Sequence, residues 1–153
     1  MKRIFKFALI AMVLLFAGLQ FVRPDRTNPP VNPADSIEAA TILPDDINSM
    51  LERSCKDCHS NETIHPWYSN ISPFSWFLAD HISEGRRQLN LSIWGTYGDR
   101  EKVHRLEEIC EVLEAGEMPL SSYLWIHRDA VLTEADSNML CSWAQSEKAR
   151  LAH

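Results

Sequence analysis

The feature that most constrains this chain is a five-residue stretch, Cys55-Lys56-Asp57-Cys58-His59. Two thiols separated by two residues can add to the two vinyl groups on one edge of a haem, and the next side chain is then an imidazole under the iron. The spacing is therefore typical of covalent, c-type haem attachment. It predicts Cys55 and Cys58 as the attachment residues and His59 as the first axial ligand.

Two other kinds of site use a similar pair of cysteines. A tetrahedral zinc site needs a second pair of Cys or His with close spacing, but Cys110 and Cys141 stand thirty-one positions apart. A thioredoxin-like redox pair needs a strand leading into the motif and a βαβ surround, and neither pattern is visible. We therefore favour one covalently attached haem c over both alternatives.

Residues 1–23 begin with basic side chains and continue as an apolar run. Lys2, Arg3 and Lys6 precede the segment 7–22, in which Gln20 is the only polar residue. This arrangement directs a chain to the secretory machinery, so we expect a signal anchor or a signal peptide. No small-residue cleavage site is evident, and the apolar stretch counted from Ile4 has about the twenty residues that a spanning helix needs. We therefore expect an inner-membrane anchor with residues 24 onward on the periplasmic side.

The next segment, residues 24–42, is predicted to be a tether. Four prolines fall between Pro24 and Ser36 among Asp, Asn and Arg residues, without apolar periodicity. Such a composition favours extended backbone and would hold a domain away from the membrane.

Helical periodicity starts at Leu43 and recurs in four stretches. We expect helices from Leu43 to the haem motif, from Ser72 or Pro73 to Arg87, from 99 to 115, and from Thr133 onward. The side chains expected on their buried faces are Ile47, Met50 and Leu51; Phe74, Phe77, Leu78, His81, Ile82, Gly85 and Leu89; Val103, Leu106, Ile109, Cys110 and Leu113; and Met139, Leu140, Trp143 and Ala144. No stretch alternates with period two, so residues 43–153 are predicted to form one all-α, c-type-cytochrome-like domain.

The distribution of charge along the chain indicates which kinds of partner the domain can bind. The whole chain has a net charge of −6, whereas residues 24–153 carry 11 basic and 21 acidic side chains, a net charge of −10. An acidic domain is a poor partner for nucleic acid. It suits redox partner proteins with a basic docking face, because complementary fields speed encounter, although acidity also serves solubility alone.

The second axial position of the iron decides between an electron carrier and a reactive or sensing centre. Met118 is the predicted ligand, since it follows a helix stop at Gly116 and precedes Pro119, in a loop that can aim its thioether. His81, at the centre of an apolar helix face, is the second choice, and an open site is the third. Other Met and His residues are interpreted as core, exposed or too close to His59 in sequence: Met50, Met139, His65, His104, His127 and His153.

The chain resembles the bacterial haem-binding domain family of short, c-type-cytochrome-like proteins over about residues 40–147. The resembling segments are the Cys55–His59 motif with Ser60-Asn61-Glu62-Thr63, Pro66-Trp67-Tyr68-Ser69-Asn70-Ile71, Glu84-Gly85-Arg86, Leu89-Asn90 and Gly116-Glu117-Met118-Pro119-Leu120. The resemblance implies an exported, monohaem, all-α domain attached through Cys55 and Cys58 and ligated by His59. The Gly-x-Met-Pro segment is similar to the ligand loop of small cytochromes c and supports Met118.

Several roles remain open at this point. Trp67, Tyr68, Arg86 or Arg87 can contact a haem propionate, although Trp67 can equally be a lid on the core. Cys110 and Cys141 are expected either to form a disulfide or to stay as two buried thiols.

The function that we predict is a periplasmic, membrane-tethered, monohaem electron carrier without catalytic residues of its own. The alternatives are a haem-based sensor or ligand-binding module, and a small peroxidase-type enzyme with an open distal site.

Overall fold

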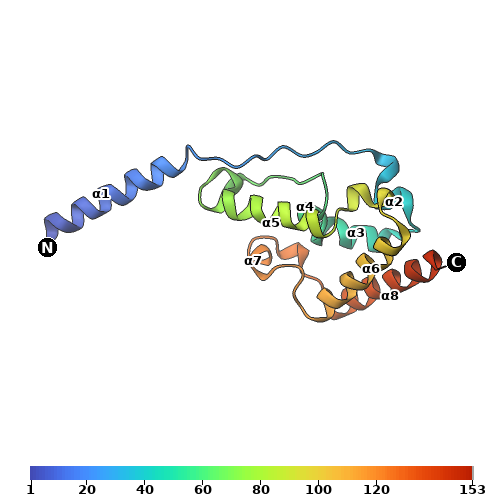
Figure 1. Cartoon of the computed structure of the whole chain (residues 1–153). Helices are drawn as coiled ribbons and strands as arrows, with labels where there is room; N and C mark the ends of the chain where they lie inside the picture. The colour runs from blue at the N-terminus through green and yellow to red at the C-terminus, as the bar shows by residue number, and fades with distance from the viewer. Residues whose placement is uncertain (153) are drawn as a thin grey trace.

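The computed structural model describes residues 1–152, and all regular secondary structure in that range is helical (Figure 1). The α-helices are α1 (Lys2–Leu19), α2 (Ile37–Ala40), α3 (Asp45–Ser54), α4 (Lys56–His59), α5 (Phe74–Gln88), α6 (Asp99–Glu114), α7 (Ser121–Leu124) and α8 (Glu134–Leu151). Short 3-10 helices are η1 (Pro33–Asp35), η2 (Trp67–Asn70), η3 (Leu91–Thr96) and η4 (Arg128–Ala130). The all-α class predicted from the sequence is confirmed.

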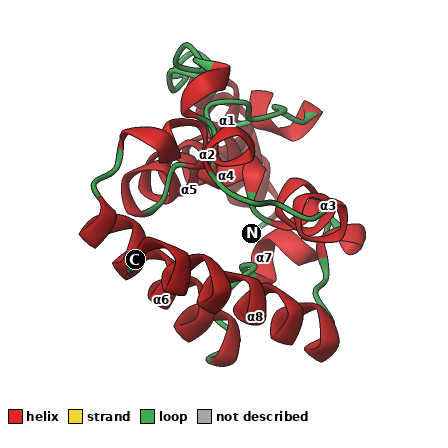
Figure 2. Ribbon diagram, turned by 90° about the vertical axis from the view of Figure 1, so that its right-hand side faces the viewer, coloured by secondary structure: helices red, strands yellow, loops and turns green. Residues whose placement is uncertain are grey.

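The hydrophobic core lies where α2, α3, η3, α6 and α8 meet. Its buried members are Ile37, Ile47, Met50, Leu51, Leu91, Trp94, Leu106, Leu140, Trp143 and Ala144. Helices α6 and α8 pack side by side (Figure 2), and α3 contacts both α8 and α4. Because α3 runs directly into the predicted haem motif, the core fixes the position from which that motif starts.

The four predicted helices are present, with ends within two residues of those expected. Helix α6 stops before Gly116, whose φ of +67° is the left-handed conformation that ends a helix. Helix α8 starts with a capping box, in which the Thr133 hydroxyl accepts from the Asp136 N–H and the Asp136 carboxylate accepts from the Thr133 N–H. These local signals explain why the boundaries could be predicted.

Three side chains expected in the core are exposed instead. Phe74 and Phe77, on the first turns of α5, are 62% and 53% exposed, because α5 packs on α4 through Ile82 and Gly85 further along. Met139 on α8 is 41% exposed, since the buried face of that helix passes through Leu140 and its neighbours. The predicted apolar face of α5 is thus wrong at Phe74 and Phe77, whereas Leu78 is half-buried.

Helix α1 buries none of its side chains and projects away from the rest of the molecule (Figure 1). It ends at Leu19 and includes the basic residues Lys2, Arg3 and Lys6, so its apolar part is shorter than the twenty residues expected from Ile4. Within residues 1–152, no helix has the length and apolar character required to cross a bilayer.

Residues 20–32, which we call the strap, lie against the helical domain. Gln20 exchanges two hydrogen bonds with the backbone of Ser72, at 3.0 and 3.1 Å, and the Trp76 indole donates to the Val22 carbonyl at 2.8 Å. Further along, Asn28 donates to the Thr63 carbonyl at 3.0 Å. Of the segment expected as a tether, residues 24–42, Asn28 is thus bonded to the loop after α4, and Ile37 of α2 is fully buried in the hydrophobic core. The expected tether is therefore part of the folded domain.

Candidate functional site

The Cys55–His59 motif forms a single tight turn at the break between α3 and α4. Cys55 leaves the helical region, with φ −125° and ψ −45°, and its carbonyl accepts from the N–H groups of Cys58 and His59 at 3.2 and 2.9 Å. The Cys55 N–H still bonds to Leu51 of α3 at 3.0 Å. The three predicted haem residues are thus presented by one compact segment that α3 anchors in the core.

His59 is half-buried and a hydrogen bond orients its ring. Nδ1 lies 3.1 Å from the Leu89 carbonyl oxygen, and a carbonyl can only accept, so Nδ1 carries the proton. This tautomer leaves the lone pair on Nε2, the arrangement of a metal-binding histidine held by an outer hydrogen bond. Burial lowers the pKa of His59, although the Leu89 carbonyl favours the protonated form, so the imidazole is kept neutral.

Gly85 lets α5 approach the motif closely. A Cβ at this position would lie 2.7 Å from the Cys58 carbonyl oxygen and 3.1 Å from the carbonyl carbon. Both are backbone atoms that cannot rotate away, so any side chain would push α5 off α4. The short gap between the two helices therefore depends on glycine.

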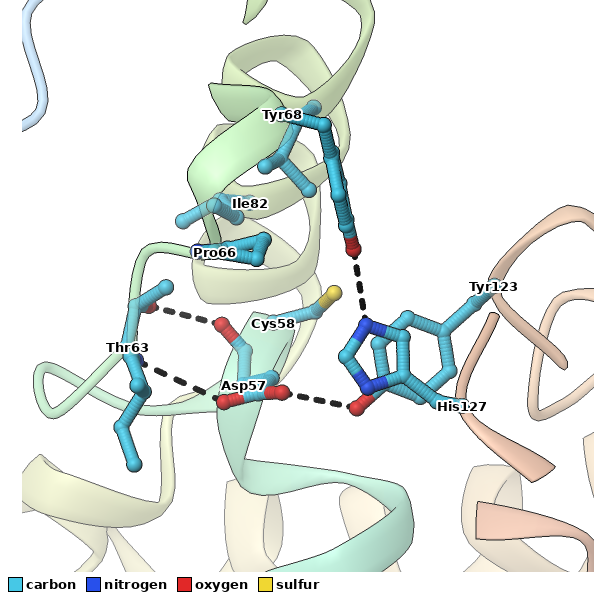
Figure 3. A pocket seen from close by; sticks show the side chains of 10 residues that line it. Asp57, Cys58, Thr63, Pro66, Tyr68, Ile82, Tyr123 and His127 are labelled. Carbon is cyan, nitrogen blue, oxygen red and sulfur yellow. Dashed lines mark hydrogen bonds between the residues drawn. The ribbon is translucent and has the colours of Figure 1, made fainter. Parts of the chain in front are cut away.

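Cys58 opens onto a hollow whose far wall comes from the segment after Met118. Tyr68, Leu78, Ile82, Tyr123 and His127 are among the residues that line it (Figure 3). The Tyr123 ring stacks on the His127 ring with centroids 4.1 Å apart, and the Tyr68 hydroxyl is 2.7 Å from His127 Nε2. Apolar and hydrogen-bonding side chains from four separate segments thus converge beside the second cysteine.

One hydrogen bond, which we call the latch, joins the motif to this far wall. The Tyr123 hydroxyl donates to Oδ2 of Asp57 at 2.7 Å, and Asp57 lies between the two cysteines (Figure 3). Burial and the neighbouring carboxylate of Asp57 raise the pKa of Tyr123, so its hydroxyl stays a donor. Sequence reasoning missed this contact, which spans sixty-six residues.

Met118 lies half-buried in the loop between α6 and α7. Its N–H and that of Glu117 both point to the Val112 carbonyl, at 3.4 and 2.9 Å, so the loop folds back on the end of α6. The latch residue Tyr123 follows five positions later and ties the same segment to the motif. Met118 stays a prediction as the second ligand, and the structure adds a means of holding its loop.

The competing histidines occupy different environments from those expected. His81 is partly exposed, with Nδ1 bonded to the Phe77 carbonyl of its own helix at 2.8 Å and its ring 4.1 Å from that of Phe77. His127, interpreted as exposed, lines the hollow beside Cys58. The stacked rings of Tyr123 and His127 could have been sought in the sequence as two aromatic residues four positions apart, shortly after Met118.

The four residues considered for contact with a haem propionate differ in exposure and in hydrogen-bond partners. Trp67 is 75% exposed, which excludes the alternative of a lid on the core, and Tyr68 is bonded to His127. Arg87 is exposed and pairs with Glu84. Arg86 instead donates to the Ser60 carbonyl at 2.7 Å, directly after His59.

The remaining cysteines face each other across α6 and α8. Both are free thiols, and burial, followed by contact with Cys141, raises the pKa of Cys110 to about 12. Within residues 1–152, they do not combine with other His, Cys, Asp or Glu side chains into a metal-binding group.

Comparison with known proteins identifies the family. The sequence model of the haem-binding domain matches residues 14–146, whereas no curated protein and no solved structure matches the chain. The match begins well before the expected residue 40, so it includes the strap that is fastened to the domain. Two thiols and one oriented imidazole within one turn are the donor set that a covalently attached haem needs; Cys58 lines the hollow, whereas Cys55 packs against the hydrophobic core in this structure. The chain belongs to the haem-binding domain family.

Proposed function

We propose that this protein is a monohaem, c-type electron carrier, attached to its haem through Cys55 and Cys58 and ligated by His59. The observation that carries the proposal is the bond from His59 Nδ1 to the Leu89 carbonyl, which leaves Nε2 available within the same turn as both thiols. A bound haem would supply one-electron chemistry between Fe(III) and Fe(II). The chain itself orients the imidazole and keeps it half-buried.

Apolar side chains near the motif support a large flat ligand at this place. Leu78 and Ile82 line the hollow beside Cys58, and Phe77 lies one position before Leu78 on α5 with half of its surface exposed. Trp125 and Ile126, between the stacked rings of Tyr123 and His127 in sequence, are 73% and 62% exposed. Exposed apolar side chains on the two segments that line the hollow suit a porphyrin, which buries a large apolar area.

We assign Met118 to the second axial position. Its thioether would complete a low-spin site that changes oxidation state with little rearrangement. Support comes from the latch, which fastens the segment 118–127 to the residue between the two cysteines. On this proposal Tyr123 is a positioning residue for Met118.

Export to the periplasm and protein partners complete the proposal. The exposed, basic and apolar helix α1 suits an export signal read at the inner membrane. The net charge of −10 over residues 24–153 suits redox partners that present a basic face.

The test is to produce the full chain together with a c-type haem maturation system. Intact-protein mass spectrometry should show one haem added, and the oxidised protein should show a sulfur-to-iron charge-transfer band. Met118→Ala should lose the band, whereas Met139→Ala, an exposed methionine on α8, should keep it. The bare polypeptide mass after maturation would overturn the proposal.

A second candidate is a ligand-binding or peroxidase-type haem protein. The observation in its favour is the Tyr68–His127 pair, because hydrogen-bonded acid and base groups line the hollow beside Cys58. A high-spin ferric spectrum in the unaltered protein would favour this candidate over the electron carrier.

A further inference from the structure

The surface around the base of α1 carries three exposed aromatic side chains, which we call the aromatic patch. Phe21 of the strap is 89% exposed, Trp67 of η2 is 75% exposed and Phe74 at the start of α5 is 62% exposed. None of the three lines the hollow beside Cys58. Large exposed rings gathered in one region mark an interaction surface, and this one is separate from the hollow.

The strap holds the end of α1 beside these rings. Gln20, the first residue after α1, exchanges two hydrogen bonds with the backbone of Ser72, and the Trp76 indole donates to the strap two residues further along. The two bonded residues of the strap flank Phe21, and the two bonded residues of the domain flank Phe74. Figure 1 shows α1 meeting the rest of the molecule at this end. A surface that receives α1 therefore also reaches the aromatic patch.

Helix α1 itself calls for apolar surroundings. It buries none of its side chains, and Ile4, Phe5, Phe7 and Leu14 are among those more than half exposed. Apolar surface of this extent gains free energy when it leaves water. Insertion of an apolar helix into the outer part of a bilayer provides this gain and does not require a helix long enough to cross.

The segments that form this surface lack acidic residues, although the chain as a whole is acidic. Residues 1–24 and 63–79 contain no Asp or Glu, whereas the whole chain has 21 of them. Arg23 is exposed in the strap and has no carboxylate partner among the described residues. Anionic phospholipid headgroups attract basic side chains and repel carboxylates. The charge around the aromatic patch therefore suits a lipid surface better than it suits a basic protein partner.

We propose that α1 and the aromatic patch form one surface that binds a phospholipid bilayer and holds the helical domain directly against it. Tryptophan prefers the boundary between headgroups and acyl chains, which is where Trp67 would lie. The domain then has one orientation at the membrane, in place of the freely tethered domain expected from the prolines. The inference rests on the part of the proposed function that brings α1 to the inner membrane, and it does not depend on the haem.

The experiment uses the full chain, produced with the haem maturation system and bound to vesicles of phosphatidylcholine and phosphatidylglycerol. A phospholipid with a photoreactive diazirine at the top of its acyl chain is included, and mass spectrometry locates the residues that it labels. Label is expected on α1 and on residues 64–77. Ile42 is the internal reference, because it is 71% exposed and follows α2 at the opposite end of the molecule (Figure 1), and it should stay unlabelled.

Variants then test the patch itself. The double variant Trp67→Ser/Phe74→Ser should lose the label on residues 64–77 and keep the label on α1, whereas Ile42→Ser, the matched control, should change neither. Label confined to α1 in the unaltered protein would overturn the proposal, because the domain would then hang free of the bilayer. Equal label at Ile42 and in residues 64–77 would overturn it as well. So would a dimer in detergent that the double variant dissociates, since the patch would then bind a second copy of the chain.

Two provisions keep the result interpretable. Phe21→Ser, which alters the strap and not the helical domain, is measured in parallel in case the double variant fails to fold, and it should lower the label on residues 64–77 in the same direction. An intact mass that includes haem but lacks α1 would overturn the membrane surface and leave the proposed haem function standing. A bare polypeptide mass together with label on residues 64–77 would refute the haem function and leave the membrane surface standing.

Discussion

Two regions of this molecule are stabilised in opposite ways. We call residues 37–54, 89–115 and 132–151 the bundle, and residues 56–88 and 116–127 the haem side. In the bundle the large side chains that are fully buried are apolar, among them Ile37, Ile47, Trp94, Leu106 and Leu140. On the haem side the buried residues are mostly small and polar: Ser60, Asn61, Thr63, Ser69, Ser72 and Ser75.

Apart from Ile82, which is buried, most large apolar residues of the haem side are half-buried or exposed. Ile64, Trp67, Phe74, Phe77, Trp125 and Ile126 are all more than half exposed. Because apolar burial is the main favourable term in folding, the bundle supplies most of the stability. The haem side keeps its geometry through directed hydrogen bonds and leaves these apolar side chains exposed.

Leu106→Ala should have the largest effect on stability, because it opens a cavity in the bundle. Leu106 is 1% exposed at the contact of α6 with α8, so we expect a loss of about 2 to 5 kcal/mol in the free energy of unfolding. Met139→Ala, at an exposed site on α8, should change it by no more than about 0.5 kcal/mol. Urea denaturation measures both, and similar losses would contradict the assignment of stability to the bundle.

Gly85→Ala tests the contact on which the haem side is built. The added Cβ meets backbone atoms of Cys58, so α5 has to move, at a cost of about 1 to 3 kcal/mol. Haem incorporation should fall as well, because the shift separates Leu89 from His59. In Gly98→Ala the added Cβ meets no atom within 4 Å. This variant should lose less than about 1 kcal/mol in the free energy of unfolding, because alanine is a poorer N-cap of α6, and it should incorporate haem normally. Equal haem content in the two variants would argue against the close contact.

The bundle could be predicted from the sequence because its signals are local. Thr133 and Asp136 cap α8 within one turn, Gly116 ends α6, and the spacing of Ile47, Met50 and Leu51 shows which face of α3 is buried. Each of these signals depends on neighbours within four residues. Local signals of this kind can be recognised without knowing which distant segments pack against them.

The haem side could be predicted only in part. The turn of Cys55 to His59 and the start of α5 follow from local spacing, but the latch joins residues far apart in sequence, and such a bond leaves no periodic pattern. The apolar spacing of Phe74 and Phe77 predicted a buried face, whereas hydrophobic periodicity shows which side chains share a face and not what covers it. The strap was missed for the same reason, since its bonds to Ser72 and Thr63 link separate segments.

Tyr123→Phe tests whether a hydrogen bond of the haem side has a role beyond stability, because it removes the latch and keeps the ring that stacks on His127. Loss of the bond to Asp57 should lower the free energy of unfolding by about 1 kcal/mol and weaken the sulfur-to-iron charge-transfer band. Tyr97→Phe is the matched variant in the bundle, where the Tyr97 hydroxyl accepts from the Asn90 N–H at 3.0 Å. It should cost a similar amount and leave the band intact. If both variants retained the band equally, Tyr123 would have no positioning role.

The smallest expected effect is a loss of stability in alkali that arises in the bundle. Burial, followed by contact with Cys141, holds the pKa of Cys110 at about 12, above the value of 9.0 for an ordinary thiol. Between these two values the unfolded chain releases a proton that the folded chain keeps, so the free energy of unfolding falls as pH rises from about 9 to about 12. Below pH 9 this thiol contributes no pH dependence, because both states are protonated.

Cys110→Ser isolates this contribution, because a hydroxyl does not ionise in that range. The unfolding free energy of the variant, followed by urea denaturation of haem-loaded protein at intervals from pH 7 to 11, should decline less steeply above pH 9 than that of the unaltered protein. Tyrosines whose pKa is raised, such as Tyr97, contribute equally to both curves and cancel in the difference. Parallel curves would mean that the Cys110 thiol ionises as easily in the folded bundle as in the unfolded chain, and so is not shielded between α6 and α8.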